Sequence, residues 1–157
     1  LLNPWFPPAM VLGVYDPDLM EPYIEALKFL GRHKALVVHG SGLDEVALHG
    51  PTSCALLSEG RIERFIITPE DLGLKEASID SIRGGDPKEN ARDCENIWKG
   101  QGSLAKTSMV AAGAGALLWL SGHAESWRVG VNHAMKALSE GKPYELLMNV
   151  REFHHGS

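Results

Sequence analysis

Two adjacent carboxylates, Asp44 and Glu45, follow a short aliphatic run, residues 35–38, and a glycine-containing segment, residues 39–42. In open α/β sheets, ligands bind just beyond the carboxyl ends of the strands. Two neighbouring carboxylates repel each other, and a divalent cation between them relieves that repulsion. Oxygen ligands of this kind suit Mg²⁺, which keeps several waters and binds one or two carboxylates together with substrate phosphates. Asp44 and Glu45 are therefore candidate magnesium ligands, and a solvated pair in a turn is the alternative that the spacing leaves open.

The histidines and cysteines form no pattern typical of a zinc or nucleophile site. The spacing between His39 and His49 matches no zinc-binding motif, and neither Cys54 nor Cys94 has a second soft ligand nearby in the sequence. We expect His39 to be a hydrogen-bonded residue at the end of a strand. The sequence also lacks a P-loop, a nucleophile elbow and a Cys–His arrangement for nucleophilic catalysis.

Three glycine-containing segments are open to a structural interpretation. Gly40 and Gly42 allow a sharp turn or a close approach of the backbone to a ligand. Residues 113–115 resemble the start of a dinucleotide fingerprint, but Leu118 stands where the third glycine is required, so we expect the small residues 111–116 to let another helix approach closely. We interpret residues 84–86 as a turn that leads into a helix.

Length and composition indicate one ordinary globular domain. The chain has 157 residues, of which 44% are apolar and 22% charged, and its formal net charge of -5 argues against a nucleic-acid binder. Two cysteines are too few for a disulfide framework, so a reducing, cytoplasmic location is expected. The longest apolar run, residues 109–120, is shorter than the roughly 20 residues that cross a membrane, so we expect no membrane association. The absence of an initiator Met suggests a piece of a longer protein.

The first half of the chain is predicted to contain short strands around one helix. A β-like run at residues 11–15 precedes Asp16-Pro17, which together are typical of a helix start, and the helix should end at Gly31. The run 35–38 is typical of a strand buried on both faces. Further β-like runs are expected at residues 46–48, 53–57 and 61–67, the last two joined by a Glu59-Gly60 turn.

The second half is predicted to be helical. Asp86, Pro87 and Glu89 form a capping-box pattern at the start of a helix that should end near residue 99. Two more helices are expected over residues 105–120 and 124–140, and a short final helix from Pro143. The fold class that these elements predict is α/β, with a central, mostly parallel sheet flanked by helices. Residues 1–150 should form this domain and residues 151–157 a tail.

Seven segments occur in the order and approximate spacing found in the anthranilate phosphoribosyltransferase family, which the chain resembles from residue 1 to about residue 148. The segments are Leu1-Leu2-Asn3-Pro4, Gly13-Val14-Tyr15, Val37-Val38-His39-Gly40, Gly42-Leu43-Asp44-Glu45, Gly50-Pro51-Thr52, Pro69-Glu70-Asp71-Leu72-Gly73-Leu74 and Gly84-Gly85-Asp86-Pro87-Lys88-Glu89-Asn90.

The resemblance implies a fold, a reaction and a metal site. The fold would be the C-terminal α/β domain of a nucleoside phosphorylase-like phosphoribosyltransferase, beside a small helical domain. The reaction would transfer phosphoribose from phosphoribosyl pyrophosphate (PRPP) to anthranilate in tryptophan biosynthesis, usually in a homodimer. The family's Gly-Leu-Asp-Glu motif binds magnesium, which implies that Asp44 and Glu45 do so here.

The departures from the family pattern are also informative. The family's Gly-Thr-Gly-Gly-Asp phosphate loop, its Lys-His-Gly-Asn segment and its anthranilate-contacting Arg precede the first matching segment, and none of them occurs in this sequence. The chain thus resembles a C-terminal half whose partner is the missing N-terminal half, and alone it should be inactive. Residues 111–113 replace an Asn found in many members, which argues against a substrate role for that helix.

Two other functions stay open at this stage. One is a nucleoside phosphorylase-like enzyme, against which the acidic pair argues. The other is a non-catalytic relative of the same fold that binds nucleic acid or another protein, against which the net charge and the intact acidic pair argue.

Overall fold

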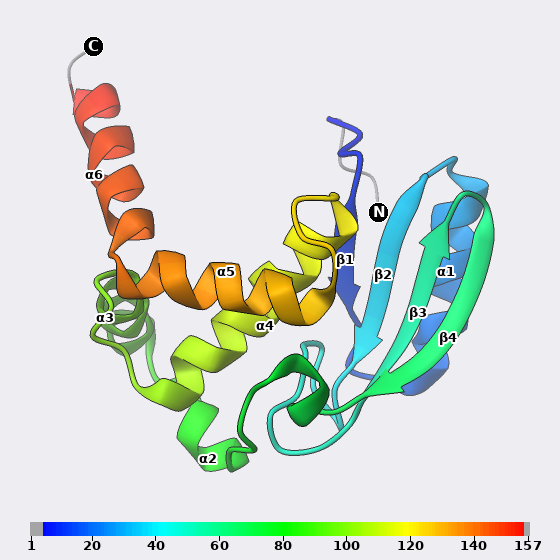
Figure 1. Cartoon of the computed structure of the whole chain (residues 1–157), viewed down its shortest axis with the longest axis horizontal. Helices are drawn as coiled ribbons and strands as arrows, with labels where there is room; N and C mark the ends of the chain where they lie inside the picture. Colours follow the sequence, from blue (N-terminus) through cyan, green and yellow to red (C-terminus); the bar gives the residue numbers. More distant parts are fainter. Residues whose placement is uncertain (1–4, 156–157) are drawn as a thin grey trace.

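The computed structural model describes residues 5–155, which form a four-stranded sheet covered by helices (Figure 1). The strands are β1 (Met10–Gly13), β2 (Lys34–His39), β3 (Thr52–Ser58) and β4 (Arg61–Ile67), in the order β1-β2-β3-β4. The expected α/β class with flanking helices is confirmed. The expected parallel pairing holds for β1–β2 alone, whereas β2–β3 and β3–β4 are antiparallel. Only β1 and β2 are joined by a helical crossover, which a parallel pair requires.

The two faces of β2 are buried against different helices. Ala35 and Val37 belong to the core cluster that contains Ile24 and Leu27 of α1 (Met20–Phe29). The alternate residues, Leu36 and Val38, belong to the cluster formed with α4 (Leu104–Leu120) and α5 (Trp127–Ser139), on the opposite side of the sheet. The prediction that this strand is buried on both faces is confirmed. Packing on both faces holds the carboxyl end of β2 in place.

Local capping signals place most helix boundaries. Asp16 accepts a hydrogen bond from the backbone N–H of Asp18 at 3.0 Å, so the expected start opens as a 3-10 turn, η1 (Pro17–Leu19), which continues into α1. The capping box of α3 (Pro87–Trp98) is present as predicted. The remaining helices are η2 (Glu70–Leu72), α2 (Ile79–Ile82) and α6 (Lys142–His155). None of the helices within residues 5–155 combines the length and apolar character needed to cross a membrane.

Three features differ from the sequence-based expectations. The strand expected at residues 46–48 is wrong: these residues form a loop whose apolar side chains are fully or almost fully buried. The short helix α2 has no counterpart among the predicted elements. The helix α6 continues through residue 155, so residues 151–155, expected as a tail, are helical. The first matching segment, residues 1–4, lies outside the described residues, as do residues 156–157.

Helices α4 and α5 cross at a pair of glycines. A Cβ atom at Gly115 would lie 2.5 Å from the backbone nitrogen of Val131, and one at Gly130 would collide with the carbonyl oxygen of Gly115. The indole N–H of Trp127 donates to the carbonyl oxygen of Ala112 at 2.9 Å and links the two helices further. The predicted role of residues 111–116 in close helix packing is confirmed.

This crossing predicts opposite effects of Gly→Ala at two neighbouring positions of α4. A Cβ at Gly113 would meet nothing within 4 Å, so Gly113→Ala should raise the free energy of unfolding by about 0.5–1 kcal/mol through helix propensity. Gly115→Ala adds a methyl group against the backbone of α5 and should lower the free energy of unfolding by about 1–3 kcal/mol. Urea denaturation of the two variants measures both, and equal effects would contradict the close crossing.

Candidate functional site

The loop after β2 begins with a tight reverse turn over residues 40–43. The N–H of Gly40 donates to the carbonyl oxygen of Leu43 at 2.9 Å, and the N–H of Leu43 donates to the carbonyl oxygen of Gly40 at 3.1 Å. Ser41 and Gly42 occupy its two central positions with φ of 50° and 93°, which is typical of a type I′ turn. The turn reverses the chain at the end of β2, so Asp44 and Glu45 return toward the sheet.

The acidic pair lies against the carboxyl ends of the two parallel strands. A Cβ atom at Gly13, the last residue of β1, would collide with the carbonyl oxygen of Asp44. A Cβ at Gly40, directly after β2, would collide with the carbonyl oxygen of Glu45. Both glycines are therefore required for this close backbone approach. The predicted position of the pair, just beyond the ends of parallel strands, is the one that the structure shows.

His39 connects the two strand ends to the turn. Its Nδ1 lies 2.9 Å from the carbonyl oxygen of Val14, and its Nε2 lies 3.3 Å from the backbone nitrogen of Gly42. Because a carbonyl oxygen can only accept and an N–H can only donate, Nδ1 carries the proton and Nε2 accepts. The prediction that His39 is a hydrogen-bonded residue at a strand end is confirmed.

Neither carboxylate of the pair is neutralised within the described chain. Asp44 and Glu45 are both exposed by surface area, and no ion pair or side-chain hydrogen bond joins either of them to another residue of segment 5–155. Glu45 nevertheless lines a pocket. Partial burial raises the pKa of its carboxyl group, and the negative charge of Asp44 raises that pKa further. The two side chains are thus close enough to repel each other.

The pocket beside Glu45 has a volume of about 300 Å³ and a mainly apolar lining, with a polar wall to which Asn90, Asp93 and Lys106 contribute. That wall comes from the loop before α3, from α3 itself and from the first turn of α4. The residues that line the whole pocket are Glu45, Ile82, Gly84, Asn90, Asp93, Cys94, Ile97, Lys106, Met109 and Val110. Glu45, from the loop after β2, therefore faces the consecutive elements α2, α3 and α4, which lie almost 40 residues or more away in the sequence.

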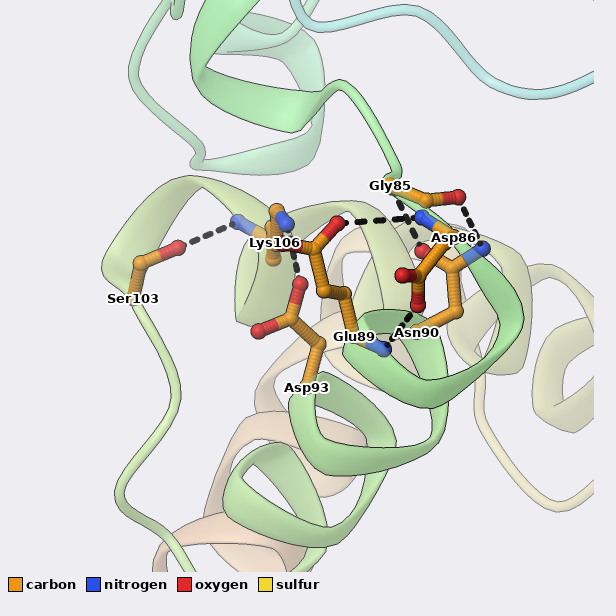
Figure 2. A network of polar contacts seen from close by, with 7 residues as sticks. All are labelled: Gly85, Asp86, Glu89, Asn90, Asp93, Ser103 and Lys106. Atoms are coloured by element: carbon orange, nitrogen blue, oxygen red, sulfur yellow. Dashed lines mark hydrogen bonds and ion pairs between the residues drawn. The ribbon is translucent and has the colours of Figure 1, made fainter.

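Figure 2 shows how the polar wall is fixed. The amide group of Asn90 accepts from the N–H of Gly85 at 2.8 Å and donates to the carbonyl oxygen of Gly85 at 3.0 Å. Asp86 accepts from the N–H groups of the first turn of α3, and Glu89 accepts from the N–H of Asp86 at 3.0 Å, which completes the capping box. These bonds hold the 84–86 loop on the start of α3.

Lys106 is the cation on this wall, and it is paired with another residue. Its Nζ forms an ion pair with Asp93, which joins α4 to α3 (Figure 2). The Lys106–Asp93 pair carries no net charge, so it does not offset the negative charges of Asp44 and Glu45. The edge of the pocket that holds the acidic pair therefore favours a cation.

The donor set fits magnesium with incomplete protein coordination. No group of three or more His, Cys, Asp or Glu side chains that could hold a metal occurs among residues 5–155. Two exposed carboxylates cannot enclose an ion, but they suit Mg²⁺, which keeps several waters and takes its remaining ligands from substrate phosphates. This arrangement agrees with the chemistry expected of the pair and does not suit a structural zinc site, which needs four protein ligands.

Sequence reasoning missed the polar wall. Residues 84–86 form the predicted turn leading into a helix, but they also bring Asn90 and Asp93 to the pocket of Glu45. Lys106 carries no sequence signal, because its partner lies 13 residues away on another helix. His39 and the Gly-Leu-Asp-Glu segment are the parts of the site that the sequence located.

Comparison with known proteins assigns a family. Residues 1–144 match the family described as glycosyl transferase family, a/b domain. The chain belongs to this family. It is 46% identical over 147 residues to the anthranilate phosphoribosyltransferase of Shewanella sp. (strain ANA-3), a match that covers 94% of this chain and 42% of that relative.

Solved structures of the family agree with the fold. The crystal structure of anthranilate phosphoribosyltransferase from Thermus thermophilus matches with a TM-score of 0.80 and 36% identity, over 87% of this chain and 40% of that one. The Saccharomyces cerevisiae enzyme in complex with PRPP and Mg matches with a TM-score of 0.78 and 26% identity, over the same shares of each chain. The resemblance expected from the sequence is confirmed, and the chain spans less than half the length of these relatives.

The electrostatic coupling within the pair is directly testable. In the chain without metal, we expect the Glu45 carboxyl group to titrate above its ordinary range. Asp44→Asn removes the neighbouring charge, so the pKa of Glu45 should fall while the part of the shift caused by burial remains. A ¹³C NMR titration of the side-chain carboxyl carbons measures this. Glu63→Gln, the same loss of charge on β4, should leave Glu45 unchanged, and an equal response to both variants would contradict the coupling.

Proposed function

We propose that this chain is part of an anthranilate phosphoribosyltransferase, which transfers phosphoribose from PRPP to anthranilate in tryptophan biosynthesis. The observation that carries the proposal is the uncompensated Asp44–Glu45 pair at the carboxyl ends of β1 and β2. It supports a site for a cation and a polyanion in a chain that is 46% identical to enzymes of this name. An acidic chain can bind a polyanionic substrate when a metal supplies the local positive charge.

In this proposal, Asp44 and Glu45 hold Mg²⁺ through their carboxylate oxygens. Bound magnesium would neutralise the diphosphate of PRPP and stabilise it as a leaving group. The chain's own contribution is to orient the two carboxylates, because the turn at residues 40–43 and the contact with Gly13 fix their backbone. Asn90 and the Lys106–Asp93 pair form the polar wall of the pocket beside Glu45.

We further propose that the complete enzyme contains an N-terminal half and forms a homodimer. The chain covers 42% of the Shewanella relative, and the phosphate loop and anthranilate-contacting Arg of the family are absent from its sequence. The structure also leaves apolar surface open on α4, where Val110 and Leu117 border a largely apolar pocket of about 570 Å³. Such a surface is typical of an interface, and the absent half is the occupant that the length of the relatives supports.

The metal site predicts charge-dependent binding of Mg²⁺ to the 157-residue chain. Asp44→Asn and Glu45→Gln should each weaken binding by about tenfold, because each removes one unit charge close to a divalent ion. Isothermal titration calorimetry, or the broadening of nearby NMR signals by Mn²⁺, measures the loss. Glu63→Gln is the matched control and should bind as the unchanged chain does. Equal binding by all four proteins would rule out the pair as the metal site.

Catalysis should require the absent half. The 157-residue chain mixed with PRPP, anthranilate and Mg²⁺ should leave the fluorescence of anthranilate unchanged, because it lacks the phosphate loop. Joining it to the part of the Shewanella enzyme that precedes the matched region should give turnover, and Asp44→Asn in that fusion should reduce kcat/KM by about tenfold or more. Turnover by the isolated chain, or an active fusion that is insensitive to Asp44→Asn, would refute the corresponding part of the proposal.

A further inference from the structure

We infer that His39 is a positioning residue for the carboxylate pair, which it orients through the turn at residues 40–43. This inference rests on the proposed role of Asp44 and Glu45 as magnesium ligands. His39 does not contact either carboxylate; it acts on the backbone that carries them.

The turn adopts a conformation that its sequence alone does not favour. Ser41 has a φ of 50°, a left-handed value that costs a residue with a Cβ atom free energy. Its hydroxyl group donates to the carbonyl oxygen of Pro51 at 2.7 Å, and Nε2 of His49 donates to the carbonyl oxygen of Ser41 at 3.1 Å. These two bonds hold Ser41 from the far end of the loop. Both bonds involve Ser41, and neither involves Gly42, which lies on the side of the turn that leads to Asp44.

His39 restrains the side of the turn that contains Gly42. Its ring donates to the carbonyl oxygen of Val14, directly after β1, and accepts from the N–H of Gly42 in the turn. One rigid ring thus joins the ends of both parallel strands to the turn that precedes Asp44. A neutral imidazole suits this position because it donates at one ring nitrogen and accepts at the other.

The consequence is an acidic pair whose backbone is in place before a cation arrives. The carbonyl oxygen of Asp44 already lies against Gly13 in the chain without metal, and the turn at residues 40–43 sets the path of the backbone to that position. A loop that is ordered in advance loses less conformational entropy on binding, which strengthens the binding of the ion. Without the His39 bond, the turn would keep the two backbone bonds between Gly40 and Leu43 but would lose the side-chain bond that restrains Gly42.

The first test is the tautomer of the neutral His39 ring. Nitrogen-15 correlation NMR of the imidazole distinguishes the two neutral tautomers, and the geometry requires the proton on Nδ1. This measurement uses the unchanged 157-residue chain and so does not depend on a variant that folds. A proton on Nε2 in the neutral ring would overturn the inference.

The second test separates the hydrogen bonds of His39 from its bulk. His39→Phe keeps a ring but removes both bonds, and should weaken Mg²⁺ binding by about fivefold while amide hydrogen exchange at Gly42 becomes faster. His39→Gln places an acceptor near the former Nε2 and should restore binding to within about twofold of the unchanged chain. His33→Phe, at the opposite end of β2, is the matched control and should change neither quantity.

The outcomes distinguish this inference from the proposed function. His39→Phe with unchanged Mg²⁺ binding and unchanged exchange at Gly42 would overturn the positioning role, as would equal weakening by the Phe and Gln variants. If the unchanged chain binds no Mg²⁺, or if Asp44→Asn leaves its Mg²⁺ affinity unchanged, the proposed metal site fails. Exchange at Gly42 then still decides whether His39 holds the turn.

Discussion

The parallel pairing of β1 and β2 is the constraint on which the site depends. It brings the carboxyl ends of the two strands to one edge of the sheet, where the backbone of Asp44 lies against Gly13. A side chain at Gly13 would force the acidic segment away from that edge. The pairing is itself fixed because β2 is buried on both faces, by α1 on one side and by α4 and α5 on the other.

Two like charges lie side by side in the acidic loop, and no basic side chain within residues 5–155 forms an ion pair with either of them. Burial and the charge of Asp44 raise the pKa of Glu45, while Lys106, the cation on the polar wall of the pocket, is paired with Asp93. Electrostatic repulsion between the carboxylates is therefore present in the folded chain, and the energy of the two core clusters maintains it. A site of this kind binds a cation strongly compared with a pair that could separate freely.

Local sequence signals predicted the elements better than the contacts between them. Asp16 and Asp86 cap helices through bonds to residues two or three positions away, so their patterns can be recognised in the sequence. The loop at residues 46–48 resembles a strand in its sequence, but burial, not pairing, explains its apolar residues. His39 meets Val14 from 25 residues away, and Lys106 meets Asp93 from another helix, so neither contact has a local pattern.

The core and the site can be separated because they use different interactions. The apolar clusters around β2 do not include Asp44 or Glu45. Val46 and Leu48 anchor the end of the acidic loop in the core, whereas its first part, residues 39–43, is held by backbone and side-chain hydrogen bonds. Each such bond contributes about 1 kcal/mol, which is small beside the burial of the core. Loss of one of these bonds therefore alters the orientation of the carboxylates long before it threatens the fold.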